Sequence, residues 1–182
     1  GNFGVSMNLY KDMPVASLVG NAAKISFLYG LAAVIIGTII GMALGVFAAL
    51  HRNSIWDTLA TALSVIGVSI PSFVFALLIL IFFASYLRIL PTAYSSSQPI
   101  YSSIMPAALS TGVIANVSRF TRTEMIEVLD SDYMILAKAK GLDRKTLIFS
   151  HALRNALIPV ITILGPILVN LMTGTMVVEL LC

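Results

Sequence analysis

The chain has 182 residues, of which 58% are hydrophobic and only 10% are charged, and its mean hydropathy is +0.97. Soluble domains carry about 25% charged residues, so this composition excludes an ordinary soluble domain and indicates a protein of the lipid bilayer. The net charge is +3, but in such a protein the placement of the basic residues is more informative than their sum.

Residues 1–24 are moderately polar and contain no long apolar run, so we expect an extracytoplasmic lead-in with an interfacial helix after Pro14. Because Gly1 is not an initiator methionine and no signal peptide precedes the first apolar run, we expect the chain to be a segment of a longer protein. The lone Cys182 excludes an internal disulfide and lies in what we interpret as a truncated end, 179–182.

Long stretches of low charge predict an all-α integral membrane protein with about four transmembrane helices, at 25–50, 58–87, 106–124 and 157–178. At a rise of 1.5 Å per residue, the first stretch forms a helix of about 39 Å, which crosses a hydrocarbon core of about 30 Å with some tilt. The second stretch is longer than a bilayer requires, and Pro71 predicts a kink within it.

The first span carries three glycines on one helical face, Gly37, Gly41 and Gly45. This spacing is a doubled small-xxx-small pattern, which lets another helix approach closely. The pattern fits either packing within a bundle or a homodimer seam, and we favour packing within the bundle.

The third span is too polar for a lipid-facing helix, since it includes Ser110, Gly112 and Asn116. A helix of this kind is expected to face the bundle interior or a water-filled path. These three residues and Pro71 are therefore the candidates for a translocation path, although plain structural packing explains Pro71 equally well.

The stretch 131–159 is the most charged part of the chain and predicts two short helices joined by a turn. Ser131 is the expected N-cap of the first helix. Gly141 follows a basic last turn, as expected of a residue with positive φ after a helix end. Asp143 is the expected N-cap of the second helix, which we predict to run to about Asn155, with Pro159 marking its end or a bend into the next span.

This stretch resembles the EAA loop of binding-protein-dependent ABC importer permeases, although the leading glutamate of that family is absent. The fuller form AKAKGL…HALRNALIPV is similar to the oligopeptide and dipeptide branch, as are the segments GNFGVS near the start and G-x-S-I-P-S-F around Pro71. The positions matching the loop, which the resemblance assigns to ATPase coupling, are Ala137, Ala139, Gly141, Leu142, Asp143, His151, Arg154 and Pro159.

The resemblance implies a type-I ABC importer permease bundle at 25–178, without the first and last spans of the family. It also implies two ABC ATPase subunits, a second and usually different permease subunit, and an external substrate-binding protein. ATP and magnesium would be bound by the ATPase subunits, with no cofactor in this chain. The implied substrate is a peptide, with nickel or another small solute as the alternative, and the implied location is a bacterial or archaeal plasma membrane crossed several times.

Charge distribution predicts the orientation independently. Most of the eleven lysine and arginine residues fall on the side of the 131–159 loop. The residues on that side are Arg52, Arg119, Arg122, Lys138, Lys140, Arg144, Lys145 and Arg154, and those on the other are Lys11, Lys24 and Arg88. The positive-inside rule therefore places 51–57 and 125–156 in the cytoplasm.

The sequence contains no P-loop, C-x-x-C, H-E-x-x-H or G-x-S-x-G motif, so we predict a non-catalytic subunit with no metal site. The acidic residues between Glu124 and Asp132 are interpreted as a solvated, ion-paired helix surface, and few aromatics accompany the basic loop, so nucleic acid is not an expected partner. Two functions of other classes stay open, a stand-alone secondary carrier and a membrane scaffold.

Overall fold

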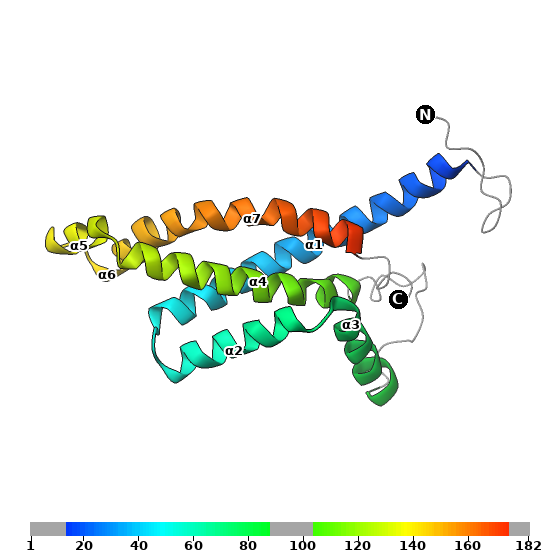
Figure 1. Ribbon diagram of the computed structural model, residues 1–182, viewed down its shortest axis with the longest axis horizontal. Coiled ribbons are helices and arrows are strands. Elements are labelled where there is room, and N and C mark those ends of the chain that lie inside the picture. Colours follow the sequence, from blue (N-terminus) through cyan, green and yellow to red (C-terminus); the bar gives the residue numbers. More distant parts are fainter. Residues whose placement is uncertain (1–13, 88–103, 175–182) are drawn as a thin grey trace.

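The computed structural model describes residues 14–87 and 104–174, and every regular element in these two stretches is a helix (Figure 1). The predicted all-α fold is therefore confirmed. The elements, in chain order, are α1 (Val15–Leu50), α2 (Ile55–Ser69), α3 (Ser72–Leu80), the π-helical segment η1 (Ile81–Tyr86), α4 (Ile104–Leu129), α5 (Asp132–Ala139), α6 (Arg144–Thr146), the π-helical segment η3 (Leu147–Ala152) and α7 (Leu153–Gly174).

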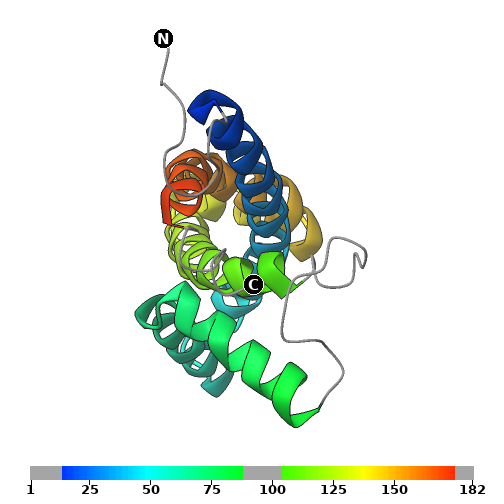
Figure 2. The same ribbon diagram turned by 90° about the vertical axis from the view of Figure 1, so that its right-hand side faces the viewer.

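Helix α4 is the centre of the bundle, because it contacts α1, α2, α3 and α7. Figure 1 shows α1, α4 and α7 extending along the long axis of the molecule, with α2 on the far side of α4 from α7. Seen end-on, the helices surround α4 on several sides (Figure 2). The α5–α6 hairpin and the α1–α2 turn lie at the same end of the bundle.

The glycine stripe of α1 packs against α4, which confirms packing within the bundle as the role of these glycines. A Cβ atom added at Gly37 would lie 2.5 Å from the Cβ of Val113, and one at Gly45 would lie 2.5 Å from the carbonyl oxygen of Ser118. At these positions only glycine leaves room for the neighbouring helix. Because lipid tails are as apolar as the side chains here, close packing holds the seam together.

The stretch 58–87 is divided at Pro71, so the prediction of one kinked helix is wrong, although the position of the bend is right. Helix α2 ends at Ser69, Ile70 is extended (φ −88°, ψ 121°), and Pro71 is the N-cap of α3. A residue before proline is disfavoured in the helical region, and proline has no N–H to continue the hydrogen-bond ladder. Helix α3 consequently runs at a steep angle to α2 (Figure 1).

The predicted helix end near Asn155 is also wrong. From Arg144 the chain remains helical through α6, η3 and α7, and Pro159 lies inside α7. A proline removes one hydrogen bond from a membrane helix and is tolerated where neighbouring segments support the turn. Ala156 and Val160, on either side of Pro159, are both buried in the bundle, which keeps the helix continuous.

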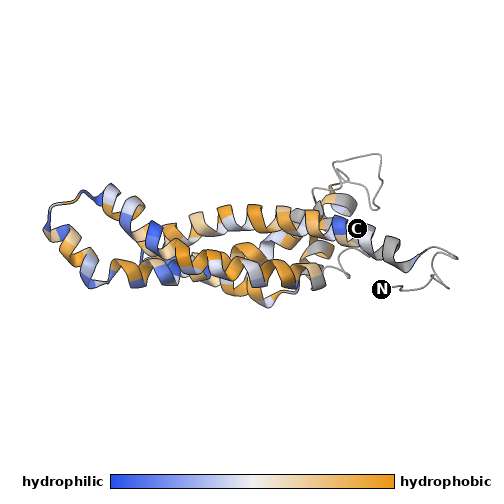
Figure 3. Cartoon of the chain, turned by 90° about the horizontal axis from the view of Figure 1, so that it is seen from above, coloured by the Kyte–Doolittle hydropathy of each residue, from blue (hydrophilic) through white to orange (hydrophobic). Residues whose placement is uncertain are grey.

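Two helices in the described stretches are long and apolar enough to cross a membrane, Ser26–Leu50 and Arg144–Met172. They correspond to the first and last predicted spans, and the end of the last span, 175–178, lies outside the described residues. The expected interfacial helix after Pro14 is the start of α1 and continues directly into the span. Apolar residues cover the middle of the bundle, and hydrophilic residues gather at the α5–α6 end (Figure 3).

Candidate functional site

Helix α5 begins at the predicted N-cap, Ser131, but the side chain of that residue does not cap it. The backbone of Ser131 has cap geometry (φ −72°, ψ 151°), whereas its hydroxyl donates a hydrogen bond backward to the carbonyl of Val128. The carboxylate of Asp132, in the first turn, is the remaining favourable group at this helix N-terminus.

The turn after α5 is built around Gly141, which has φ of 82° as predicted. The N–H of Gly141 donates to the carbonyl of Lys138 (3.0 Å) and the N–H of Leu142 donates to that of Ala137 (3.4 Å), which together make a Schellman motif. A Cβ added at Gly141 would have no atom within 4 Å. The backbone conformation, and not a lack of space, is therefore the reason for glycine here.

Asp143 caps the next helix, as predicted. Its carboxylate accepts hydrogen bonds from the backbone N–H groups of Lys145 (3.1 Å) and Thr146 (3.2 Å), and from the hydroxyl of Thr146. These bonds favour the ionised form, so the Thr146 hydroxyl first, and then the backbone N–H groups, hold the pKa of Asp143 below its ordinary value. The turn from α5 to α6 is thus closed by a glycine on one side and a cap on the other.

The inner face of the hairpin is packed onto the bundle. Met134 and Ala137 are the buried residues of α5. They belong to one apolar cluster drawn from α1, α4, α5, η3 and α7, whose buried members are Ala49, Met125, Met134, Ala137, Leu147, Ile148, Ala152 and Ala156. A hydrogen bond from the Asn155 amide to the Tyr133 hydroxyl (2.8 Å) adds a polar link between α5 and α7. The hairpin therefore shares one apolar cluster with three long helices, α1, α4 and α7.

The outer face of the hairpin exposes large apolar side chains. Ile135 is 58% exposed, Leu136 57% and Phe149 62%. Exposed apolar side chains with polar residues around them, at the hydrophilic end of the bundle, are typical of an interaction site. These residues are not among those predicted from the sequence, because only the helical phase seen in the structure separates them from the inward-facing Ala137.

The predicted coupling residues are distributed over three places. Ala139, Gly141, Leu142 and Asp143 lie at the exposed tip of the hairpin, whereas Ala137 is buried against the bundle. The other predicted residues lie along the helix that follows: His151 is half-buried in η3, Arg154 is exposed at the start of α7, and Pro159 is half-buried further along α7.

Two ion pairs that were not predicted from the sequence join the start of α2 and the turn before it to the second half of α4 and the residue that follows it. Asp57 is 4% exposed, and its carboxylate accepts two hydrogen bonds from the Arg122 guanidinium, one of 2.7 Å from Nη2 and a shorter one from Nε. The N–H of Asn53, whose φ is 63°, donates to the same carboxylate (3.0 Å). The second pair, Arg52 with Asp130, is exposed. The signal in the sequence was Asp57, an acidic residue at the edge of an apolar stretch, which indicates a need for a charged partner.

The candidate path residues do not share one face. Ser110 is 2% exposed, and its hydroxyl donates to the Ala107 carbonyl (2.8 Å) on the side of α4 that packs against α1. Gly112 and Asn116 are half-buried on another face, where a Cβ at Gly112 would meet nothing within 4 Å. The Asn116 amide donates to the Gly112 carbonyl (2.9 Å). Pro71 lies apart from them, at the α2–α3 break.

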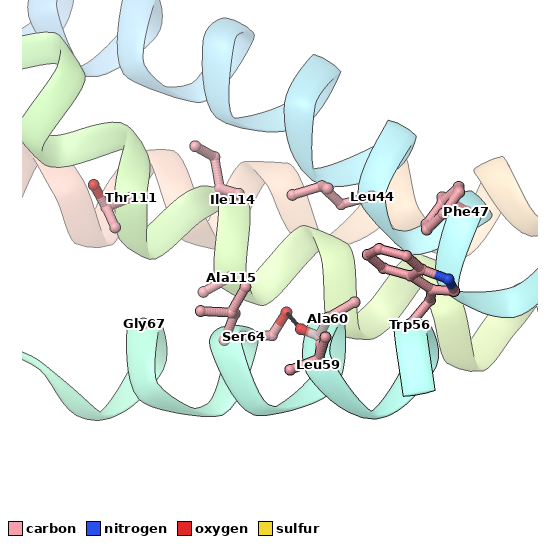
Figure 4. A pocket seen from close by; sticks show the side chains of 11 residues that line it. Leu44, Phe47, Trp56, Leu59, Ala60, Ser64, Gly67, Thr111, Ile114 and Ala115 are labelled. Carbon is pink, nitrogen blue, oxygen red and sulfur yellow. Dashed lines mark hydrogen bonds between the residues drawn. The ribbon is translucent and has the colours of Figure 1, made fainter. Parts of the chain in front are cut away.

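An apolar hollow of about 400 Å³ lies between α1 and α2, with α4 as its floor (Figure 4). Figure 4 shows Leu44 and Phe47 of α1 facing Trp56 and Leu59 of α2 across it. Ser64, one of its few polar residues, already donates to the Ala60 carbonyl (2.8 Å). A hollow with so few free polar groups does not suit a polar solute, so it is a weaker path candidate than the Gly112–Asn116 face.

The fold and this site together define an α-helical membrane protein with a hairpin packed against one end of its bundle. The chain belongs to the family of binding-protein-dependent transport system inner membrane components, whose model matches residues 41–182. It is therefore a type-I ABC permease subunit, the class that the EAA-like motif indicated.

The curated relatives are peptide transport permeases. The chain is 42% identical to the dipeptide transport system permease protein DppB of Lactococcus lactis subsp. cremoris and to the oligopeptide transport system permease protein OppB of Haemophilus influenzae, each over 180 residues. It is 43% identical over 178 residues to DppB of Bacillus subtilis. These alignments cover 98% of this chain and 57–58% of each relative, so the chain spans less than two thirds of their length.

Proposed function

We propose that the chain is the channel-forming part of an ATP-driven peptide importer in a bacterial or archaeal plasma membrane, which it crosses several times. The observation that carries this proposal is the α5–α6 hairpin, whose outer face exposes Ile135 and Leu136 while its inner face is buried in the bundle. Such a hairpin offers a contact surface to a partner and a rigid connection to the spans. The peptide-type relatives support the choice of substrate.

In the proposed mechanism, two ABC ATPase subunits bind the outer faces of the hairpins of two permease subunits, of which the second is a different protein. The ATPase subunits bind ATP and magnesium, and this chain binds neither and catalyses no reaction. When ATP closes the ATPase pair, α5 moves with it. The Gly141 turn and the Asp143 cap keep α5 and α6 together, so the movement reaches α1, α4 and α7 through the apolar cluster around Met134.

The proposed conduit runs along the half-buried face of α4 that contains Gly112 and Asn116. The absence of a Cβ at Gly112 leaves an open surface there, and the Asn116 amide is a polar group at the same place. Ser110 lies on the opposite side of α4, where it is buried against α1 and holds the helix in place. The break at Pro71 lets α3 move independently of α2. An external substrate-binding protein delivers the peptide to the opposite end of the bundle.

The proposal is tested by purifying the full-length protein from its native membrane with the variant Leu136→Asp. We expect a P-loop ATPase to co-purify with the wild type and to be lost from this variant, because a carboxylate replaces an apolar side chain at the contact. Ile55→Asp is the matched control, since Ile55 is 78% exposed at the same end of the bundle but lies outside the hairpin.

The substrate is tested on the same complex after reconstitution in lipid nanodiscs. We expect a peptide-loaded binding protein to stimulate ATP hydrolysis, and a nickel-loaded or sugar-loaded one not to. If no ATPase co-purifies with the wild type in mild detergent, the importer proposal is wrong and a stand-alone carrier becomes the better hypothesis.

A further inference from the structure

A cleft of about 240 Å³ lies at the hydrophilic end of the bundle, behind the hairpin. It is bounded by the α1–α2 turn, the end of α4, α5 and the start of the α6–α7 helix. Four charged side chains line it: Arg52, Asp130, Lys138 and Arg144. Its volume is below the range of about 300–1,000 Å³ that is usual for pockets of drug-sized ligands, so a small headgroup fits it better than a whole nucleotide.

The charges of the cleft are unbalanced. The single carboxylate, Asp130, is already paired with Arg52, and both side chains are about half exposed. Lys138 and Arg144 have no ion-pair partner within the stretches 14–87 and 104–174. Three cations from three separate elements therefore face one carboxylate, and their mutual repulsion opposes the docking of the hairpin on the bundle. A bound anion would relieve this repulsion.

The remaining wall of the cleft is apolar, and includes Leu50, Ile126 and Ile148. Leu50 is also the last residue of the apolar helix Ser26–Leu50, so the cleft opens where the membrane-crossing part of α1 ends. A soluble anion gains nothing from an apolar wall. An amphiphile with an anionic headgroup can pair with the cations and also pack against the apolar wall. Anionic lipids are attracted to basic segments at the cytoplasmic surface.

We propose that this cleft binds the phosphate headgroup of an anionic phospholipid, which bridges Arg52 of the α1–α2 turn to Lys138 and Arg144 of the hairpin. The glycerol and the first acyl carbons lie against the apolar wall. The lipid holds the hairpin on the bundle by replacing cation–cation repulsion with a shared anion. This site lies behind the outer face that carries Ile135 and Leu136, so its occupation does not depend on an ATPase partner.

The chain supplies a matched control for this proposal. Lys140 and Lys145 belong to the same hairpin, are likewise exposed and carry the same charge, but they do not line the cleft. The test compares the double variant Lys138→Gln/Arg144→Gln with Lys140→Gln/Lys145→Gln in the full-length protein with its partners. Both variants lose two positive charges, so a general attraction to anionic membranes weakens equally in the two.

The proteins are reconstituted in an equal mixture of phosphatidylcholine and phosphatidylglycerol, extracted in mild detergent, and analysed by native mass spectrometry. We expect phosphatidylglycerol to be retained by the wild type and by Lys140→Gln/Lys145→Gln, and to be lost from Lys138→Gln/Arg144→Gln. Equal retention or equal loss in the two double variants overturns the proposal. So does a loss of partner proteins with unchanged lipid in Lys138→Gln/Arg144→Gln, which identifies an acidic protein surface as the occupant.

A second measurement on the unmodified protein does not rely on any variant. We expect amide hydrogen exchange across 138–148 to slow in nanodiscs that contain phosphatidylglycerol, relative to nanodiscs of phosphatidylcholine alone. Inorganic phosphate added to the phosphatidylcholine nanodiscs distinguishes the source of the anion. Equal protection by phosphate overturns the lipid assignment, as does exchange that is the same in both kinds of nanodisc.

Discussion

The α1–α4 seam is held together by close backbone packing, whereas the hydrophilic end of the bundle is held together by polar side-chain contacts. In the seam, glycines bring two backbones together, and the atom nearest to each glycine is a backbone or Cβ atom, which no rotamer change can move. At the hydrophilic end, polar side chains join segments far apart in the chain, such as Asp57 with Arg122 and Asn155 with Tyr133. We therefore expect the seam to be the stiffer of the two regions and the hydrophilic end to be the one that responds to charge. In the proposed mechanism, a force applied at the hydrophilic end reaches the spans through the seam.

The largest expected effect comes from filling the seam with Gly45→Val. The new side chain would begin 2.5 Å from the Ser118 carbonyl oxygen and 2.7 Å from the Thr121 Cβ, and a backbone atom cannot move aside. Overpacking of this kind costs about 1–3 kcal/mol or more even where side chains can yield. We expect most of the full-length variant to be lost from the monodisperse peak in size-exclusion chromatography.

The matched control is Gly112→Val, the same substitution on the open face of α4. We expect this variant to elute like the wild type, whatever its effect on transport. If Gly45→Val behaved like this control, the seam would not be the rigid part of the molecule.

The next effect is that of Asp57→Asn at the hydrophilic end. Removing one partner of a buried pair leaves the other charge uncompensated, which costs about 3–5 kcal/mol, and the partly exposed side chain of Arg122 places this case at the lower end. We expect a large fall in the thermal stability of the full-length protein in detergent.

The double variant Asp57→Asn/Arg122→Gln sharpens this result. Since both charges are removed, its loss of stability should be smaller than the sum of the two single losses. Additive losses in this double-mutant cycle would mean that the pair does not couple the start of α2 to α4.

A smaller effect is expected from Gly141→Val in the turn of the hairpin. Positive φ costs a residue with a Cβ about 1–2 kcal/mol, and a β-branched side chain is the worst case. We expect the variant to hydrolyse ATP with its partners but to transport less peptide per ATP, measured in proteoliposomes. Gly141→Asn is the control, because asparagine tolerates this conformation. Normal coupling in Gly141→Val would contradict the role of the turn.

The smallest effect is that of Asp143→Ala, which removes the cap of α6. Because the folded-state pKa of Asp143 is lowered, its stabilising contribution is fully present above about 3.9, the ordinary pKa of this carboxyl, and is lost as the pH falls through the lower folded value. We expect faster amide exchange at Lys145 and Thr146 in the variant, by the same factor at any pH between about 6 and 8. A factor that varied within this range would show that another group controls the turn.

The hairpin was the part of the site best predicted from sequence. The positive φ of Gly141 and the cap at Asp143 depend on residues within one helical turn, so local chemistry determines them. The helical phase of α5 was harder, because the EAA-like pattern selects Ala137, which is buried, and passes over Ile135 and Leu136, which are exposed. A motif marks a place along the chain, whereas the face of a helix depends on what packs against it.

The amino-acid sequence by itself determined the bilayer setting, the helical class, the turn at Gly141 and the helix cap at Asp143. Composition and local backbone preference determine these features, and both depend only on residues close together in the chain. Only the tertiary structure decided that the glycine stripe of α1 meets α4, and that Asp57 finds Arg122 some 65 positions away. It also decided that Pro71 breaks its helix whereas Pro159 does not. Around Pro159 the flanking residues Ala156 and Val160 are buried against other helices, and that support comes from segments distant in the chain.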